Sequence, residues 1–254
     1  MLRISKLGER EGKMNSERKI IDCFCGWYDL LGYGTAFKEA GWDLHNEVCL
    51  KNYKRIKKIG TEFHNSYTQG KTLIINDGVI KTFDVNGEKG DINNIINFLI
   101  QYVDGFNKIN EIDKKGNYPG VRGVFTFGQR YEYIPGNFIY NQSDGEIVTY
   151  YPEEFQMNTA FSKANIIEES GSKKGIAGPF LFFDKYALDE IRKIANRTKG
   201  YDVIEQYKDE KYYFSINILK HSAITLIFDE NIIEYQNKDR KIETQILKLI
   251  DSKY

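Results

Sequence analysis

The chain lacks most of the features that mark a disordered, secreted or membrane-bound protein. Its 254 residues include only four prolines and three cysteines, which argues against a proline-rich linker and against a disulfide framework. No apolar run reaches the roughly 18 residues of a membrane-spanning helix. The N-terminus has no signal-peptide pattern. We therefore expect a cytoplasmic protein that makes no contact with a membrane.

The chain also has no net charge. Lys+Arg and Asp+Glu both number 36, so the formal net charge is zero. Proteins that bind nucleic acid generally need a basic face, and this balance predicts no nucleic-acid partner, although a local basic cleft stays open. The three histidines are scattered and suggest no catalytic triad. Cys23 and Cys25 have no second Cys/His cluster to complete a tetrahedral metal site, so we interpret them as small core residues.

The sequence does contain two aspartates, each where an apolar, strand-like run meets a glycine turn. Asp29 follows residues 20–28, a near-continuous apolar run that is typical of a central strand covered on both faces. Asp77 lies in an Asn-Asp-Gly sequence between apolar segments 71–75 and 79–83, the pattern of a tight hairpin. An unpaired carboxylate is costly beside a buried strand, so the pair favours a shared cation. The alternative for Asp77 is a plain turn residue.

The residues after Asp29 suggest an anion site. Leu30, Leu31, Gly32 and Tyr33 form a glycine turn between the first strand and a predicted helix at 35–42. Backbone N–H groups at such a turn can bind a phosphate.

Apolar periodicity predicts the other elements. We expect helices at 46–59, 91–106, 153–170, 185–196 and 240–250, strands at 120–128, 178–184, 212–218 and 223–228, a charged loop at 108–118 and a protruding arm at 130–147. The core order is β-α-β-β-α-β, a ferredoxin-like α+β fold with helices on the sheet. In that topology Asp29 and Asp77 end neighbouring strands. We expect a flexible arm at 1–17, a catalytic domain at 18–198, and a C-terminal hairpin and helix at 199–254 packed on the same domain.

Four motifs in order resemble the class III nucleotidyl cyclases over residues 20–184. They are YDLLGY at 28–33, NDG at 76–78, RGVFTFG at 122–128 and MNTA at 157–160. The resemblance implies a class III cyclase core in which Asp29 and Asp77 bind two Mg²⁺ or Mn²⁺ ions and residues 30–33 cradle the triphosphate. It also implies a head-to-tail homodimer, in which Asn158 of one chain reaches the aspartates of the other. The arm could serve that dimer or simply face solvent.

The sequence departs from the family pattern at two positions. Ser162 stands where the family helix usually has arginine, so Lys163, Arg122 or Arg130 is expected to stabilise charge on the transferred phosphoryl group. Tyr151 stands where purine cyclases often have a base-recognising aspartate. This departure disfavours ATP.

The sequence around Asp29, around Asp77 and at residues 158–169 most resembles the stand-alone pyrimidine cyclases of bacterial Pycsar anti-phage systems. That resemblance implies a lyase that converts UTP or CTP to cyclic UMP or cyclic CMP and pyrophosphate, with a cyclic-nucleotide-responsive effector acting downstream. Three alternatives stay open. They are a purine cyclase using ATP or GTP, a non-catalytic nucleotide-binding module of the same fold, and a polymerase-like palm domain.

Overall fold

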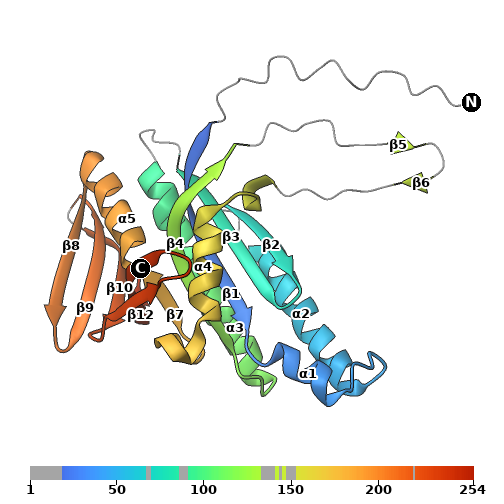
Figure 1. The fold of residues 1–254 in the computed structure, drawn as a ribbon. Helices are drawn as coiled ribbons and strands as arrows, with labels where there is room; N and C mark the ends of the chain where they lie inside the picture. The colour runs from blue at the N-terminus through green and yellow to red at the C-terminus, as the bar shows by residue number, and fades with distance from the viewer. Residues whose placement is uncertain are drawn as a thin grey trace, which may run out of the picture.

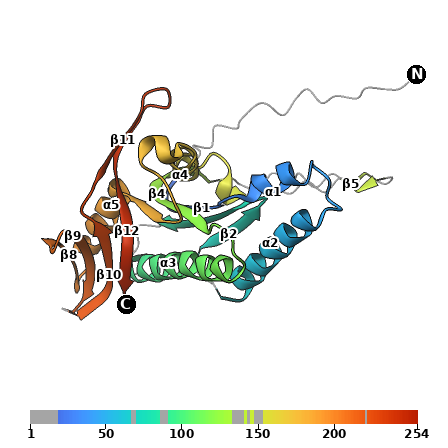
Figure 2. The same cartoon turned by 90° about the horizontal axis from the view of Figure 1, so that it is seen from below.

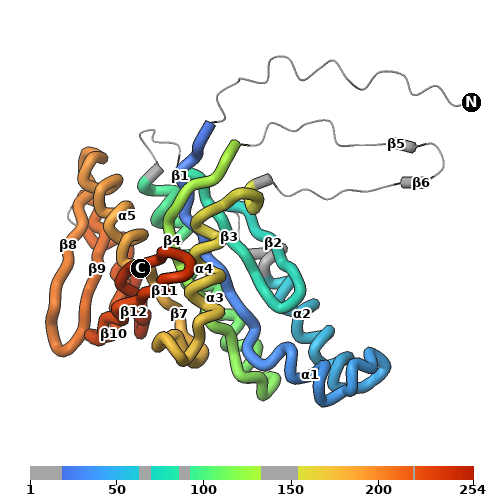
Figure 3. Tube along the Cα trace, in the orientation of Figure 1, coloured from blue at the N-terminus to red at the C-terminus, as the bar shows by residue number. Residues whose placement is uncertain are grey.

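A computed structural model describes residues 19–66, 70–85, 91–132, 141–142, 145–146, 153–219 and 221–254. The expected N-terminal arm at 1–17 and most of the expected arm at 130–147 lie outside these residues. The described chain is built around one large sheet, with helices on both of its faces (Figure 1). The path of the chain through these elements can be followed in Figure 3.

The described residues form the following strands and helices. The strands are β1 (Ile20–Leu30), β2 (Lys71–Ile75), β3 (Gly78–Val85), β4 (Val121–Tyr131), β5 (Asn141–Gln142), β6 (Gly145–Glu146), β7 (Leu181–Asp184), β8 (Tyr201–Lys208), β9 (Lys211–Ile218), β10 (His221–Asp229), β11 (Ile233–Asn237) and β12 (Ile242–Lys253). The helices are α1 (Tyr33–Glu39), α2 (Glu47–Ser66), α3 (Asp91–Lys115), α4 (Thr159–Glu169) and α5 (Lys185–Arg197), with 3₁₀ turns at Glu153–Phe155 and Gly171–Lys174.

The first four strands form the predicted ferredoxin-like core. Their order in the sheet is β2-β3-β1-β4, and each neighbouring pair is antiparallel. The order is the one that a β-α-β-β-α-β chain gives when its first strand lies beside the hairpin. The α+β fold and this core are therefore confirmed, and β1 is a central strand as its apolar run predicted.

Alternation along β1 divides the core into two layers. Phe24 and Tyr28 pack on the side of α3, whereas Cys25 and Trp27 pack on the side of α4. Figure 2 shows α2 and α3 on one side of the sheet and α4 on the other. Successive strand residues point to opposite faces, so Asp29 shares the α4 side with Trp27. The apolar residues of β1 thus also determine which face carries the first aspartate.

The C-terminal strands continue the same sheet. Beyond β4 the order runs β7-β12-β10-β9-β8, and β11 pairs with β12. The predicted hairpin is present as β9 and β10, while β8 and β11 were not predicted. No described helix is long and apolar enough to cross a membrane.

Three sequence expectations about elements were wrong. The helix expected at 240–250 is absent, and residues 242–250 belong to strand β12. Their apolar spacing also suits a strand, and β7, β10 and β11 provide pairing partners. The expected loop at 108–118 is largely the last part of α3, which buries Ile109 and Asp113. The helix expected from 153 begins only at Thr159, after Met157 adopts a positive φ of 44°.

Candidate active site

The structure places Asp29 and Asp77 at neighbouring strand ends, as the sequence predicted. Asp29 is opposite Gly78 in the β1–β3 pairing and opposite Arg122 in the β1–β4 pairing. The Leu30 amide donates to the Asp77 carbonyl oxygen at 2.9 Å. The hairpin turn and the end of the central strand are therefore bonded to each other, which keeps the two carboxylates at one end of the sheet.

Asp29 lies in an environment that is short of positive charge. The pKa of its carboxyl is raised to about 7, chiefly by burial and also by the negative charges of Glu168 and Asp77, while Arg122 lowers it. A hydrogen bond to Glu168 acts in the same direction as the burial. Glu168 and Asp77 thus disfavour the negative charge of Asp29 at this end of the sheet, and a bound cation would offset that repulsion.

Glu168 is the site residue that the sequence analysis missed. It lies on α4 and is buried together with Ala160, Ala164 and Ile167. An ionisable residue on the apolar face of a helix was the available signal, because charged side chains are rarely buried unless they are paired. Its partner is Arg122, whose Nε donates to Glu168 Oε1 at 2.6 Å and whose Nη2 bonds to the same oxygen.

Arg122 is thus the predicted cation that the structure brings beside Asp29. Its Nη1 also donates to the Ile176 carbonyl oxygen at 3.3 Å. The guanidinium is largely enclosed, with 15% of its side chain exposed. In this arrangement its charge is shared with Glu168, so a substrate phosphate would have to compete with that carboxylate for it.

Lys163 and Arg130 lie elsewhere. Lys163 Nζ donates to Asp184 Oδ2 at 2.5 Å and lies over the Tyr186 ring, between α4 and α5. Arg130 forms a two-bond pair with Asp84, at 2.7 and 2.5 Å. Both cations are engaged by carboxylates away from Asp29, so within one chain neither is placed to contact a nucleotide bound there.

Asn158 is also far from Asp29 in its own chain. It caps α4 by accepting from the Phe161 amide at 2.9 Å, and it accepts from Cys23 Sγ at 3.7 Å. Its Nδ2 donates to the Glu154 carbonyl oxygen at 3.0 Å. Cys23 is six residues from Asp29 along β1, about 20 Å at the rise of a strand. With 2% of Asn158 exposed, its amide is fully used as a structural cap.

The turn after Asp29 offers fewer free amides than its sequence suggested. The Leu30 amide donates to Asp77 and the Leu31 amide donates to the Gly120 carbonyl oxygen at 3.0 Å. Within the described residues the amides of Gly32 and Tyr33 donate to no acceptor. Gly32 has a φ of 75°, in the left-handed region that glycine adopts without strain. Only the second half of the turn is therefore available to an anion.

The aspartates suit a divalent cation as part of a donor set. Carboxylate oxygens are the ligands that Mg²⁺ and Mn²⁺ prefer. Burial and the neighbouring carboxylates raise the pKa of Asp29, so a bound cation would favour its ionised form. In the described part of the chain no group of three or more His, Cys, Asp or Glu side chains is arranged to hold a metal. The remaining ligands would have to come from substrate phosphates, water or a second chain.

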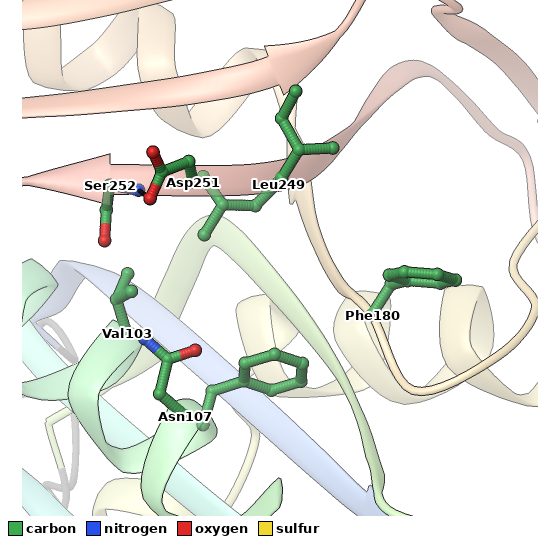
Figure 4. Close-up of a pocket in the computed structure, with 8 residues that line it drawn as sticks. Val103, Asn107, Phe180, Leu249, Asp251 and Ser252 are labelled. Carbon is green, nitrogen blue, oxygen red and sulfur yellow. Dashed lines mark hydrogen bonds between the residues drawn. The ribbon is translucent and has the colours of Figure 1, made fainter.

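The described cavities do not coincide with this site. One of about 250 Å³ lies between α3 and β12 (Figure 4). Val103 and Asn107 line it from the helix, and Leu249, Asp251 and Phe180 line it from the other side. None of its lining residues belongs to the aspartate site, which is an open strand end and not an enclosed pocket.

No protein family model and no curated protein matches the chain. Among solved structures it is similar to the adenylyl cyclase CyaB from P. aeruginosa, with 12% identity, a TM-score of 0.45, and coverage of 93% of this chain and 97% of that one. The guanylyl cyclase Cya2 gives 11% identity, a TM-score of 0.46, and coverage of 91% and 93%. A bacterial light-regulated adenylyl cyclase gives 11% identity, a TM-score of 0.40, and coverage of 80% and 93%. At these levels the likeness adds no weight, and the fold assignment rests on the strand order of the chain itself.

Proposed function

We propose that the chain is a class III nucleotidyl cyclase that converts a ribonucleoside triphosphate to its 3′,5′-cyclic monophosphate and pyrophosphate. The observation that carries the proposal is the pair Asp29 and Asp77 at adjacent strand ends, beside a glycine turn with free amides. Three of the four motifs that resemble this family in the sequence, at 28–33, 76–78 and 122–128, lie on the elements that build this site. UTP or CTP is the proposed substrate, because Tyr151 replaces the aspartate common in purine cyclases.

In the proposed reaction the ribose 3′-oxygen bonds to the α-phosphorus as the bond to the β-phosphate oxygen breaks. Pyrophosphate leaves with the electron pair, and the hydroxyl proton passes to solvent. Asp29 and Asp77 would hold two Mg²⁺ or Mn²⁺ ions, which would lower the hydroxyl pKa and neutralise phosphate charge. The Gly32 and Tyr33 amides would bind the triphosphate, with Leu30 and Leu31 contributing through the shape of the turn.

Arg122 is the proposed source of positive charge near the transferred phosphoryl group. It lies next to Asp29, whereas Lys163 is held by Asp184. To bind phosphate, the guanidinium would have to exchange Glu168 for the substrate. If a nucleotide binds while Arg122 stays paired with Glu168, we expect no product. The chain would then behave as a non-catalytic nucleotide-binding module.

The proposed active unit is a homodimer in which Asn158 comes from the second chain. Within one chain Asn158 and Asp29 are about 20 Å apart along β1, so one copy cannot bring them to the same nucleotide. To hold the ribose, the Asn158 amide would give up its bond to Glu154. The proposed product would signal to a cyclic-nucleotide-responsive effector in anti-phage defence, a role supported by the sequence resemblance alone.

The direct test is to incubate the purified chain with each of the four ribonucleoside triphosphates and Mn²⁺, and to separate the products by chromatography. We expect cyclic UMP or cyclic CMP. Cyclic AMP or cyclic GMP as the product would identify ATP or GTP as the substrate instead. The absence of a cyclic product from any of the four nucleotides would refute the proposed cyclase activity. A thermal shift with nucleotide but no product would favour the non-catalytic module.

The site assignment has its own test. We expect Asp77→Ala to abolish product formation with an unchanged fold. Asp239→Ala, which changes an exposed aspartate of a different turn, should keep full activity. Activity retained in Asp77→Ala would remove that residue from the site. For the dimer, mixing inactive Asp77→Ala and Asn158→Ala chains should restore part of the activity, because mixed dimers would contain one intact site.

A further inference from the structure

A buried arginine holds the back of the turn that follows Asp29. Arg55 on α2 exposes 1% of its side chain, and its ion-pair partner Asp113 on α3 exposes none. Arg55 Nε donates to Asp113 Oδ1 at 2.9 Å, and Nη2 donates to Oδ2 at 2.5 Å. The guanidinium also lies 4.7 Å from the ring centroid of Tyr118. A two-bond pair fixes both the position and the rotation of the guanidinium plane.

The same guanidinium reaches two backbone carbonyls at the end of the central strands. Arg55 Nη1 donates to the Leu31 carbonyl oxygen and Nη2 to the Gly120 carbonyl oxygen, both at 3.3 Å. Gly120 also accepts the Leu31 amide. Three residues earlier on α2, Asn52 donates to the Tyr33 carbonyl oxygen at 3.2 Å. Helix α2 therefore holds the turn through two polar side chains, Asn52 and Arg55, that lie about one helical turn apart.

The direction of the Leu31 carbonyl determines the direction of the next amide. A trans peptide is planar, and its C=O and N–H groups point in opposite directions. The described chain has no cis peptide bond. Because the Leu31 carbonyl faces Arg55, the Gly32 N–H points away from α2. This is one of the turn amides that donate to no acceptor within the described residues, and it belongs to the proposed phosphate-binding half of the turn.

The buried pair is better explained by this orientation than by stability. Two charges at such low exposure lose about as much free energy of hydration as their attraction returns, so a buried ion pair is weak evidence of stabilisation. What the pair does supply is a rigid set of donors behind a turn that has no side-chain cap of its own.

We infer that Arg55 is a positioning residue for the triphosphate, which orients the Gly32 amide toward the phosphates by holding the Leu31 carbonyl. Asp113 acts through Arg55 by holding its guanidinium. The inference rests on the proposed function for the identity of the ligand. The inference itself concerns only the binding of a polyphosphate at Gly32. Pyrophosphate with Mg²⁺ is therefore the probe, because it tests this binding without catalysis.

The main test is the double variant Arg55→Met/Asp113→Leu, which replaces the pair with apolar groups and leaves no unpaired buried charge. We expect a melting temperature close to that of the wild type. We expect the Kd of pyrophosphate, measured calorimetrically, and the KM of the nucleotide to rise about tenfold, the worth of one charge-assisted hydrogen bond. The kcat should change less than KM. Arg192→Met, which removes an arginine of α5 from partly exposed ion pairs, is the matched control.

Each outcome decides the inference. Wild-type pyrophosphate affinity in a folded double variant overturns it, and so does a wild-type chain that binds no pyrophosphate. If the double variant does not fold, Arg55→Lys decides instead, because lysine keeps the charge but cannot bond both carbonyls and both carboxylate oxygens. Unchanged pyrophosphate affinity in that variant also overturns the inference. A chain that binds pyrophosphate through Arg55 but cyclises no nucleotide would refute the proposed function alone.

Discussion

Replacing Asp29 by asparagine should make the protein more stable and inactive at the same time. The Asp29 carboxyl has its pKa raised to about 7 by burial, Glu168 and Asp77. A raised pKa means that the folded protein holds this proton more tightly than the unfolded chain does. The ionised form is therefore destabilising, and this cost grows as pH rises from about 4 and is complete above about 7. Asparagine has nearly the same shape and never ionises.

The expected gain in the free energy of unfolding follows from the pKa shift of Asp29. A rise from 3.8 to about 7 corresponds to about 4 kcal/mol for a fully enclosed group. Because Asp29 is only partly buried, solvent screens much of this, and we expect about 1–2 kcal/mol at pH 8. For a chain of this length the melting temperature should rise by about 4 °C.

The assay is thermal unfolding at pH 8, without and with saturating Mn²⁺, on wild type, Asp29→Asn and the control Asp22→Asn. Asp22 is an exposed residue of the same strand that accepts from Gln129, and asparagine keeps that acceptor. Mn²⁺ should raise the melting temperature of the wild type and the control but not of Asp29→Asn. A variant less stable than the wild type would refute the electrostatic argument. An equal metal shift in all three proteins would remove Asp29 as a metal ligand.

Gly26→Ala should lower the free energy of unfolding by about 3 kcal/mol in a urea titration, because a Cβ there would lie 1.9 Å from a tyrosine ring of α3. Gly34→Ala, with nothing within 4 Å of its Cβ, should cost less than about 0.5 kcal/mol. Arg122→Met should cost about 3 kcal/mol by leaving buried Glu168 unpaired, and adding Glu168→Leu should recover most of this loss. Asp229 has its pKa lowered to about 2 by hydrogen bonds from its lysine partner on β12 and from a neighbouring amide. Asp229→Asn should therefore cost under about 1 kcal/mol at pH 6, and in titrations at lower pH the difference should shrink as pH falls from 3.8 toward 2.

The sequence predicted the aspartate pair because the signals for it are local. An apolar run predicted strand β1, an Asn-Asp-Gly turn predicted the β2–β3 hairpin, and the ferredoxin-like order then placed Asp29 beside Asp77. Each step needed only neighbouring residues or the order of the elements. The pairing in the sheet bears this out.

The residues that complete the site are paired over long distances in the chain, and no local pattern contains such information. Arg122 meets Glu168 across 46 residues, and Arg55 meets Asp113 across 58. Lys163 is next to the position of the expected catalytic arginine, but its partner Asp184 comes from a different element. The error at 240–250 has a similar cause, since an apolar spacing that suits two structures is decided by neighbouring strands.

The continuity of the sheet has a consequence for how the protein unfolds. Strand β7 pairs with β4 on one side and β12 on the other. The Phe183 ring contacts Phe125 on β4, in the first half of the sheet (β2-β3-β1-β4), and Phe228 on β10, in the second half (β12-β10-β9-β8). The ring centroids are 5.1 and 5.4 Å apart. Losing residues 201–254 would expose both the edge of β7 and the core beneath it. The two halves should therefore melt as one cooperative unit in calorimetry, and a chain cut at residue 198 should not retain the aspartate site in a folded form.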